Sequence, residues 1–463
     1  MRKSNSLINN LDWALLISFV ILICFGLTTI YSVAFNEEHP SIFSFSEKYG
    51  KQVMWICLSL FLGGVVFLID SDIYKKFALP IYLCVIALLI LVLFMPPING
   101  ARAWIGVGSM GIQPAEFAKI ATALLLAKYV SSLNLKQLSS KNVLISLTII
   151  VIPMALILLQ PDAGTFIIFT AFLFVLYREG LTFDPFILKF INLFPKVNFK
   201  NTWIGSHFIP ILFVIVFLSI ITILFEHKNI GIIPGIELYG SLGIIVSLFV
   251  FSLLGLFIIQ KFGTKRERVR VRLIIILSFV IGSATSSFVE YSFVHLADHQ
   301  KDRIELFLGL EEDPNGKDYN RNRAMAAVGS GGFAGKGFKN ASVSSVKTNH
   351  VPESETDFIF CPFAEEWGFI GGALLIFLYM FVIIRILVIA ERQRSSFNRI
   401  YAYSVGMFFF YHFAINIGMS IGFAPVIGIP LPFFSYGGSS MISFSIMVFI
   451  LLKLDSQRRY VLR

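Results

Sequence analysis

Two charged side chains, Glu116 and Lys119, lie in the segment 113–119 (QPAEFAK), at the start of an otherwise apolar stretch. Residues three apart share one face of a helix, so the carboxylate and the ammonium can pair. Pro114 is typical of the first position of a helix. Charges in a membrane helix are costly unless they pair or line a polar cavity, and they are often functional. The pair is either a closed ion pair or part of a site for a charged substrate, and we favour the site.

A third ionisable residue, Asp162, lies in the segment 160–164 (QPDAG) between two apolar runs. An ionisable group in this position is a functional candidate by default. It can equally be the N-cap of a helix that starts at Ala163. The two interpretations are compatible.

A fourth candidate, Asp357, lies in the segment 351–360 (VPESETDFIF), where a polar stretch meets apolar sequence. A carboxylate at such an edge is partly desolvated and is suited to act as a general base. Alternatively, Thr356 or Asp357 caps the helix that follows. Spacing alone leaves both possibilities open.

Two further patterns imitate known motifs. The segment 329–337 (GSGGFAGKG) is similar to a phosphate-binding loop, but Ser330 replaces its first glycine and Gly337 its Ser/Thr. Tight turns that need positive φ explain the glycines better.

His295 and His299 have the spacing of a zinc motif whose glutamate is missing here, so we expect a polar helix end and no metal site.

The composition determines the class of protein that must position these residues. Of 463 residues, 56% are hydrophobic and 14% are charged, whereas about 25% is usual for a soluble domain. Four cysteines exclude a disulfide scaffold, and continuous apolar segments exclude a membrane β-barrel. The fold class is therefore all-α, a polytopic membrane helix bundle.

Charge placement predicts the orientation of the bundle. The formal net charge is +10, and much of it falls in short loops beside apolar runs. This is the mark of cytoplasmic loops, and it favours anionic membrane lipid over nucleic acid as a partner. We expect both termini in the cytoplasm and a long polar loop, residues 295–360, on the outer face.

Because a spanning helix needs about 20 apolar residues, the sequence predicts about twelve transmembrane helices. They are expected near residues 12–33, 52–69, 77–96, 113–131, 143–160, 163–179, 208–226, 239–260, 272–294, 367–390, 400–422 and 437–453.

Five motifs in order along the chain together resemble the SEDS family (shape, elongation, division and sporulation proteins). They are the segments 113–119 (QPAEFAK), 160–165 (QPDAGT), 329–337 (GSGGFAGKG), 356–368 (TDFIFCPFAEEWG) and 428–439 (GIPLPFFSYGGS). The segments 299–304 (HQKDRI) and 335–338 (GKGF) are more similar to elongation members than to division members.

The resemblance implies a peptidoglycan glycosyltransferase of the bacterial inner membrane. It would polymerise lipid II together with a class B penicillin-binding transpeptidase and other cell-elongation proteins. Asp357 matches the family's essential aspartate and would be the catalytic base. The candidates for binding the substrate and its pyrophosphate are Lys119, Glu116, Arg102, Asp162 and Arg303. No cofactor is certain, although a divalent cation (Mg or Mn) could assist the pyrophosphate.

The chain departs from the family pattern in three places. It has an apparent extra helix pair near 208–260, Glu355 where a histidine is common, and the segment 320–323 (NRNR) where a more apolar run is usual. The expected organisation is residues 1–294 for the first nine helices, 295–360 for the periplasmic loop and 361–463 for the last three helices. The competing hypotheses are a flippase for the lipid-linked precursor, a division-type paralogue, and a scaffold for the transpeptidase.

Overall fold

The computed structural model describes residues 10–97, 102–106, 111–133, 139–185, 206–227, 240–262, 265–295, 319–344 and 351–458. In this part of the chain the regular structure is helical, apart from one antiparallel bridge between Ile105 and Ile112. The chain divides into two compact units. The first unit comprises Met1–Leu133, Leu144–Val175 and Tyr319–Arg463, and the second comprises Asn134–Val143 and Leu176–Asp318.

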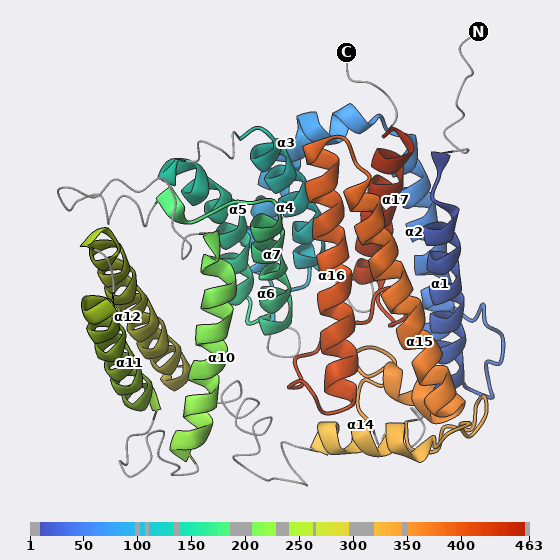
Figure 1. Ribbon diagram of the computed structural model, residues 1–463. Coiled ribbons are helices and arrows are strands. Elements are labelled where there is room, and N and C mark those ends of the chain that lie inside the picture. The colour runs from blue at the N-terminus through green and yellow to red at the C-terminus, as the bar shows by residue number, and fades with distance from the viewer. Residues whose placement is uncertain are drawn as a thin grey trace. The chain divides into compact units, whose positions relative to one another are not determined.

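The first unit is a helix bundle in which α1, α15, α16 and α17 run side by side (Figure 1). Most of α5 and the first residues of α7 also belong to it. Its helices are α1 (Trp13–Val33), α2 (Lys48–Leu68), α3 (Ser71–Val92), α4 (Pro114–Ser131), α5 (Ser140–Leu158), α6 (Ala163–Phe169), α7 (Ala171–Arg178), α14 (Tyr319–Ser330), α15 (Phe360–Glu391), α16 (Ser396–Ser420) and α17 (Gly438–Ser456).

The more polar helices form the centre of this bundle. In α16 and α17, 72% and 78% of the most apolar 18-residue stretch is buried. In α2 and α3 the corresponding share is 28%, although these two helices are more hydrophobic. Lipid tails are as apolar as leucine, so an apolar helix loses nothing by facing them, while polar side chains need protein partners. The arrangement therefore gathers the polar side chains of α4, α16 and α17 inside the protein.

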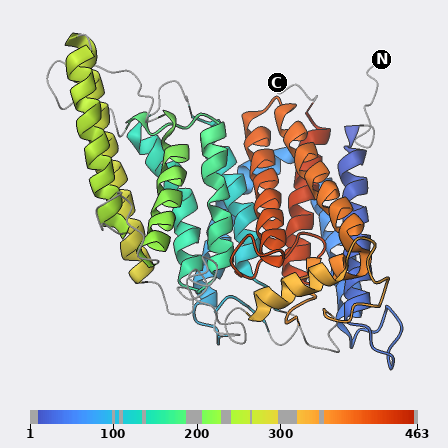
Figure 2. The same cartoon turned by 60° about the horizontal axis from the view of Figure 1, so that its bottom comes forward.

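The described parts of the predicted outer loop fold into a cap over one end of the bundle. The helix α14 lies across the ends of α15 and α16 (Figure 2). A small apolar core joins the cap to the bundle; it consists of Ala324, Ala327, Val351, Phe358, Cys361 and Met419. The cap is thus packed structure that holds the segment before α15 in place.

In the glycine-rich segment, Gly329 and Ser330 end α14, while residues 331–337 form turns, as predicted, and pack backbone to backbone against α15. A Cβ atom at Gly335 would lie 2.1 Å from the Glu366 carbonyl oxygen, and Gly368 has a positive φ of 64° at a kink in α15. The Glu365 carboxylate accepts bonds from Lys336 Nζ (2.6 Å) and from the backbone N–H of Ser344 (2.9 Å). The acceptor in this turn is a protein carboxylate, where a phosphate-binding loop would hold a phosphate.

The second unit contains three helices that pack on one another, α10 (Phe208–His227), α11 (Gly240–Phe262) and α12 (Lys265–Val294). The helices α10 and α11 coincide with the extra pair expected near 208–260. The basic run 265–272, expected to be a loop, forms the first turns of α12. Lysine and arginine are good helix formers, so charge alone does not end a helix.

Nine helices in the described residues are long and apolar enough to cross a membrane, which is the pattern of a multi-pass membrane protein. The predicted count of twelve is not confirmed, because three of the predicted segments are too charged or too short in the described residues. The helix α4 carries the charges of Glu116, Lys119 and Lys128. The segment 163–179 is divided at Thr170 into α6 and α7. The described apolar part of α10, Phe208–Ser219, is short.

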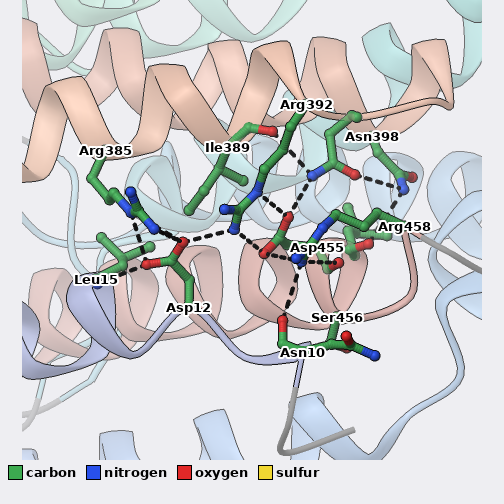
Figure 3. Close-up of polar contacts among 12 residues, drawn as sticks. Asn10, Asp12, Leu15, Arg385, Ile389, Arg392, Asn398, Asp455, Ser456 and Arg458 are labelled. Atoms are coloured by element: carbon green, nitrogen blue, oxygen red, sulfur yellow. Dashed lines mark hydrogen bonds and ion pairs between the residues drawn. The ribbon is translucent and has the colours of Figure 1, made fainter. Parts of the chain in front are cut away.

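A cluster of ion pairs joins the ends of α1, α15 and α17 (Figure 3). Asp12 caps α1 and accepts from Arg385 Nε (3.0 Å) and Arg392 Nη2 (2.7 Å). Burial raises the pKa of Asp12, but its hydrogen bonds with Arg385, the Leu15 backbone N–H and Arg392 together lower it more, so the net pKa lies below its usual value. Arg458 donates to Asp455 Oδ2 (2.9 Å) and to the Asn10 carbonyl oxygen (3.1 Å), so the two described ends of the chain lie together.

Candidate functional site

Asp357 lies in the turn that leads into α15, whereas Arg385 and Arg392, the partners of Asp12, lie at the other end of the same helix. Its side chain is half-buried. A Cβ atom at Gly428 would lie 2.9 Å from Asp357 Oδ2, and Gly428 has a positive φ of 77°. Only glycine therefore allows the segment after α16 to pass this close to the carboxylate.

The turn around Asp357 is held on both sides. Glu355 is buried and forms an ion pair with Lys48 at the start of α2. The Glu355 carbonyl oxygen accepts from Tyr436 N (2.9 Å), and the Thr356 carbonyl oxygen accepts from Ser435 Oγ (2.6 Å). Glu355, which the resemblance marks as a departure from the expected histidine, thus has a structural partner of its own.

Glu116 and Lys119 form the ion pair that their spacing predicts. Lys119 Nζ lies 2.9 Å from Glu116 Oε1, and the two residues are 0% and 3% exposed. Ser443 on α17 donates to Glu116 Oε2 at 2.8 Å. Lys119 Nζ also lies 2.9 Å from Nε2 of His412 on α16 and 4.7 Å from the ring centre of Phe444. Three helices therefore meet at this pair.

Asp162 is the N-cap of α6, because its Oδ1 accepts from Thr165 N at 2.9 Å. Its other oxygen, Oδ2, accepts from Gln113 Nε2 at 2.8 Å. Gln113 is the residue before α4, and its backbone N–H donates to Ser439 Oγ (3.0 Å) at the start of α17. Asp162 therefore caps one helix and also ties α6 to the first turns of α4 and α17.

Arg102 lies on the surface beside this region. The antiparallel bridge between Ile105 and Ile112 places the segment 102–106 next to the start of α4. The Arg102 side chain is exposed, and its Nη1 donates to the Leu93 carbonyl oxygen at 3.3 Å. Arg303, the remaining predicted site residue, lies outside the described residues.

The structure adds residues that the sequence did not single out. His412 and Asn416 lie one turn apart on α16, and Asn416 Nδ2 donates to the carbonyl oxygens of Asp357 and Ile429, both at 2.7 Å. Ser443 was missed as well. All three are polar residues inside apolar segments, which was the available signal. Among the described residues, no group of three or more His, Cys, Asp or Glu side chains is arranged to hold a metal ion.

Comparison with known proteins establishes the family. Residues 12–209 and 242–460 match the profile of the FtsW/RodA/SpoVE family, described as cell cycle proteins. The chain belongs to this family. This confirms the predicted SEDS membership, and the unmatched residues 210–241 include most of α10.

Curated relatives match over nearly the whole length. The peptidoglycan glycosyltransferase RodA of Treponema pallidum is 30% identical, with 97% of this chain and 99% of the relative covered. The peptidoglycan glycosyltransferase MrdB of Escherichia coli K12 is 27% identical, with 97% and 95% covered.

Two solved structures share the fold. A chain of a peptidoglycan synthase complex that coordinates polymerisation and crosslinking has a TM-score of 0.63 at 22% identity, covering 97% of this chain and 99% of that one. The rod shape determining protein RodA of Thermus thermophilus has a TM-score of 0.57 at 20% identity, covering 97% of this chain and 98% of that one. The all-helical membrane fold is therefore that of RodA.

Proposed function

We propose that this protein is a peptidoglycan glycosyltransferase that polymerises lipid II in the bacterial inner membrane. It acts in cell elongation with a class B penicillin-binding transpeptidase. The observation that carries the proposal is a half-buried carboxylate, Asp357, fixed in a glycine-framed turn at one end of a RodA-like bundle. The names of the full-length relatives support the same activity.

The reaction forms one glycosidic bond and breaks one sugar–phosphate bond. The acceptor sugar's hydroxyl attacks the anomeric carbon of the donor, the lipid pyrophosphate leaves, and the configuration at that carbon inverts. Asp357 takes the proton of the attacking hydroxyl as general base. A fixed, half-buried carboxylate suits this role because the base must lie within hydrogen-bond reach of the hydroxyl.

The departing pyrophosphate requires positive charge close to it. Arg102 is exposed, and beside its bond to the Leu93 carbonyl its guanidinium has further N–H groups to donate to a lipid headgroup. Arg303 is the second proposed contact. Lys119 adds positive charge from within the bundle. Glu116 and Asp162 orient this region through Lys119 and Gln113.

The charges at one end of the bundle support an orientation. Arg385, Arg392 and Arg458 gather at the end where the described part of the chain begins and ends, and positive charge favours the cytoplasm. Asp357 lies at the other end. In the proposed orientation both termini are cytoplasmic and Asp357 faces lipid II in the outer leaflet.

Purified protein in vesicles that contain fluorescent lipid II tests this function, with and without a class B transpeptidase. We expect glycan polymers on a gel. Movement of lipid II between leaflets without any polymer would refute the glycosyltransferase and support the flippase.

We also propose that a divalent cation, Mg or Mn, accompanies the pyrophosphate. The described residues hold no group of three or more His, Cys, Asp or Glu that could form a cage, so such an ion would take most of its ligands from the phosphates. Chelation with EDTA should lower turnover, and added Mg should restore it. Unchanged turnover in EDTA would remove the cation from the mechanism.

A further inference from the structure

The buried ammonium of Lys119 has three partners within the protein. It lies 2.9 Å from Glu116 Oε1, 2.9 Å from His412 Nε2 and 4.7 Å from the centre of the Phe444 ring. An ammonium has three donors and no acceptor, so His412 Nε2 must accept. The His412 proton is therefore on Nδ1.

This tautomer gives His412 a second, directed contact. Nδ1 lies 2.9 Å from the Pro430 carbonyl oxygen, which can only accept, so the ring donates to it. His412 is 2% exposed, and its ring packs edge to face against Phe444 with the centroids 4.8 Å apart. The ring is therefore fixed in both position and tautomer.

The segment 428–430 connects this histidine to the proposed base. Pro430 bonds to His412, and the preceding carbonyl, that of Ile429, accepts from Asn416 (2.7 Å). The second amide hydrogen of Asn416 is bonded to the Asp357 carbonyl oxygen (2.7 Å). Both partners of Asn416 are carbonyls, so its NH₂ group must face them.

The same segment also touches the carboxylate of the base. Gly428 passes so close to Asp357 that a Cβ atom there would lie 2.9 Å from Oδ2. The position of this backbone therefore limits the space that the carboxylate can occupy.

We infer that His412 is a positioning residue for Asp357, which joins the buried Glu116–Lys119 pair to the segment 428–430 against which the catalytic carboxylate lies. The inference rests on the proposed glycosyltransferase function. It adds His412 to the residues that serve the reaction and names the contacts through which it acts on Asp357. In this role the ion pair helps to hold the His412 ring through Lys119 and needs no contact with the substrate. The bond to Pro430 is the link on which this role depends.

Two polar replacements separate the contacts of His412. His412→Asn places an amide N–H near the position of Nδ1 and keeps the bond to Pro430, but it loses the acceptor for Lys119. His412→Gln places an amide oxygen near Nε2 and keeps that acceptor, but it loses the bond to Pro430. His412→Phe removes both. Ser404→Ala is the control, since Ser404 is a buried residue of α16 whose hydroxyl bonds only within its own helix at Ile400.

The experiment measures kcat and KM for lipid II polymerisation, together with thermal melting, for the wild type and the four variants. We expect His412→Phe and His412→Gln to lower kcat about 100-fold, the order of loss that misplacement by about 1 Å produces. His412→Asn should recover at least about 10-fold of this loss, and KM should stay within about 2-fold throughout, because binding is not the function of His412. Ser404→Ala should leave both constants unchanged.

Three results would overturn the inference while leaving the glycosyltransferase function intact. They are a kcat that follows the melting temperature in all His412 variants, a loss confined to KM, and recovery by His412→Gln but not by His412→Asn. Wild-type protein that forms no polymer would instead overturn the proposed function and this inference together.

Discussion

Replacing Lys119 with methionine would leave the Glu116 carboxylate in the bundle interior with only the Ser443 hydroxyl as a partner. Lys119 is 0% exposed, so water cannot take the place of the lost ammonium. Removing one member of a buried ion pair typically costs about 3–5 kcal/mol. We take about 3 kcal/mol, because the energetic cost of a charge at the centre of a membrane helix is also about 3 kcal/mol. The unfolding equilibrium constant should rise by about 100-fold.

The double variant Glu116→Gln/Lys119→Met tests the physical reason for this loss. It removes both charges, so no buried carboxylate is left unpaired, and more than half of the lost stability should return. Lys128→Met is the matched control on the same helix. Its ammonium is exposed and bonds only a backbone carbonyl, that of Lys76, so it should cost less than about 1 kcal/mol.

Equilibrium unfolding by SDS in mixed micelles measures all four proteins under one condition. The reasoning would be refuted if Lys119→Met were as stable as the wild type. It would also be refuted if the double variant were no more stable than the single one.

Further predictions concern topology, backbone and pH. In a cysteine-free background, Ala334→Cys, which is exposed in the cap, should react with an impermeant maleimide from outside the cell. Arg394→Cys, which is exposed between α15 and α16, should not react. The reverse labelling pattern would contradict the proposed orientation. Gly428→Ala should lower turnover at least about 10-fold, because its Cβ would displace the catalytic carboxylate. Gly180→Ala is the control, since Gly180 has a similar positive φ but open space around it, and turnover should not fall. Equal turnover of the two variants would show that the close approach at Gly428 is unimportant. The folded-state pKa of Asp12 lies below its unfolded value, so its stabilising contribution is complete above about pH 4 and is lost as the pH falls further. Asp12→Asn should therefore unfold with a weaker acid dependence than the wild type in parallel melts from pH 3 to 7, and identical pH profiles would contradict the ion-pair account.

The parts of the site that the sequence predicted are local. Glu116 and Lys119 pair because they are three apart on one helix, and Asp162 caps α6 because it precedes the first helical residue. The contributions of His412, Asn416 and Ser443 could not be predicted. Their partners lie on other helices, and hydropathy does not say which helices are neighbours or which face of each is turned inward.

The helix count and the outer loop show the same division between local and long-range information. The apolar segments were located well, but the break at Thr170 depends on local backbone geometry that apolarity does not encode. The sequence did not predict α14 within the polar loop, because Ala324 and Ala327 are the only buried apolar residues among its described side chains and they give a weak helical pattern. The turns at 331–337 were predicted from their glycines, whereas their packing against Glu365 and Gly368 could be seen only in the fold.

The central claim is that Asp357 removes a proton during glycan polymerisation, and Asp357→Asn tests it most directly. The amide keeps the size of the side chain, and the backbone bond to Asn416 is unchanged, so the protein should fold and melt as the wild type does. An amide cannot accept the proton, and loss of a general base lowers rates by about 10²–10⁴-fold. The measurement is the rate of undecaprenyl pyrophosphate release from purified lipid II by wild-type and Asp357→Asn protein at equal concentration. We predict at least about 100-fold slower release from the variant, whereas wild-type release and normal glycan chains from Asp357→Asn would contradict the account.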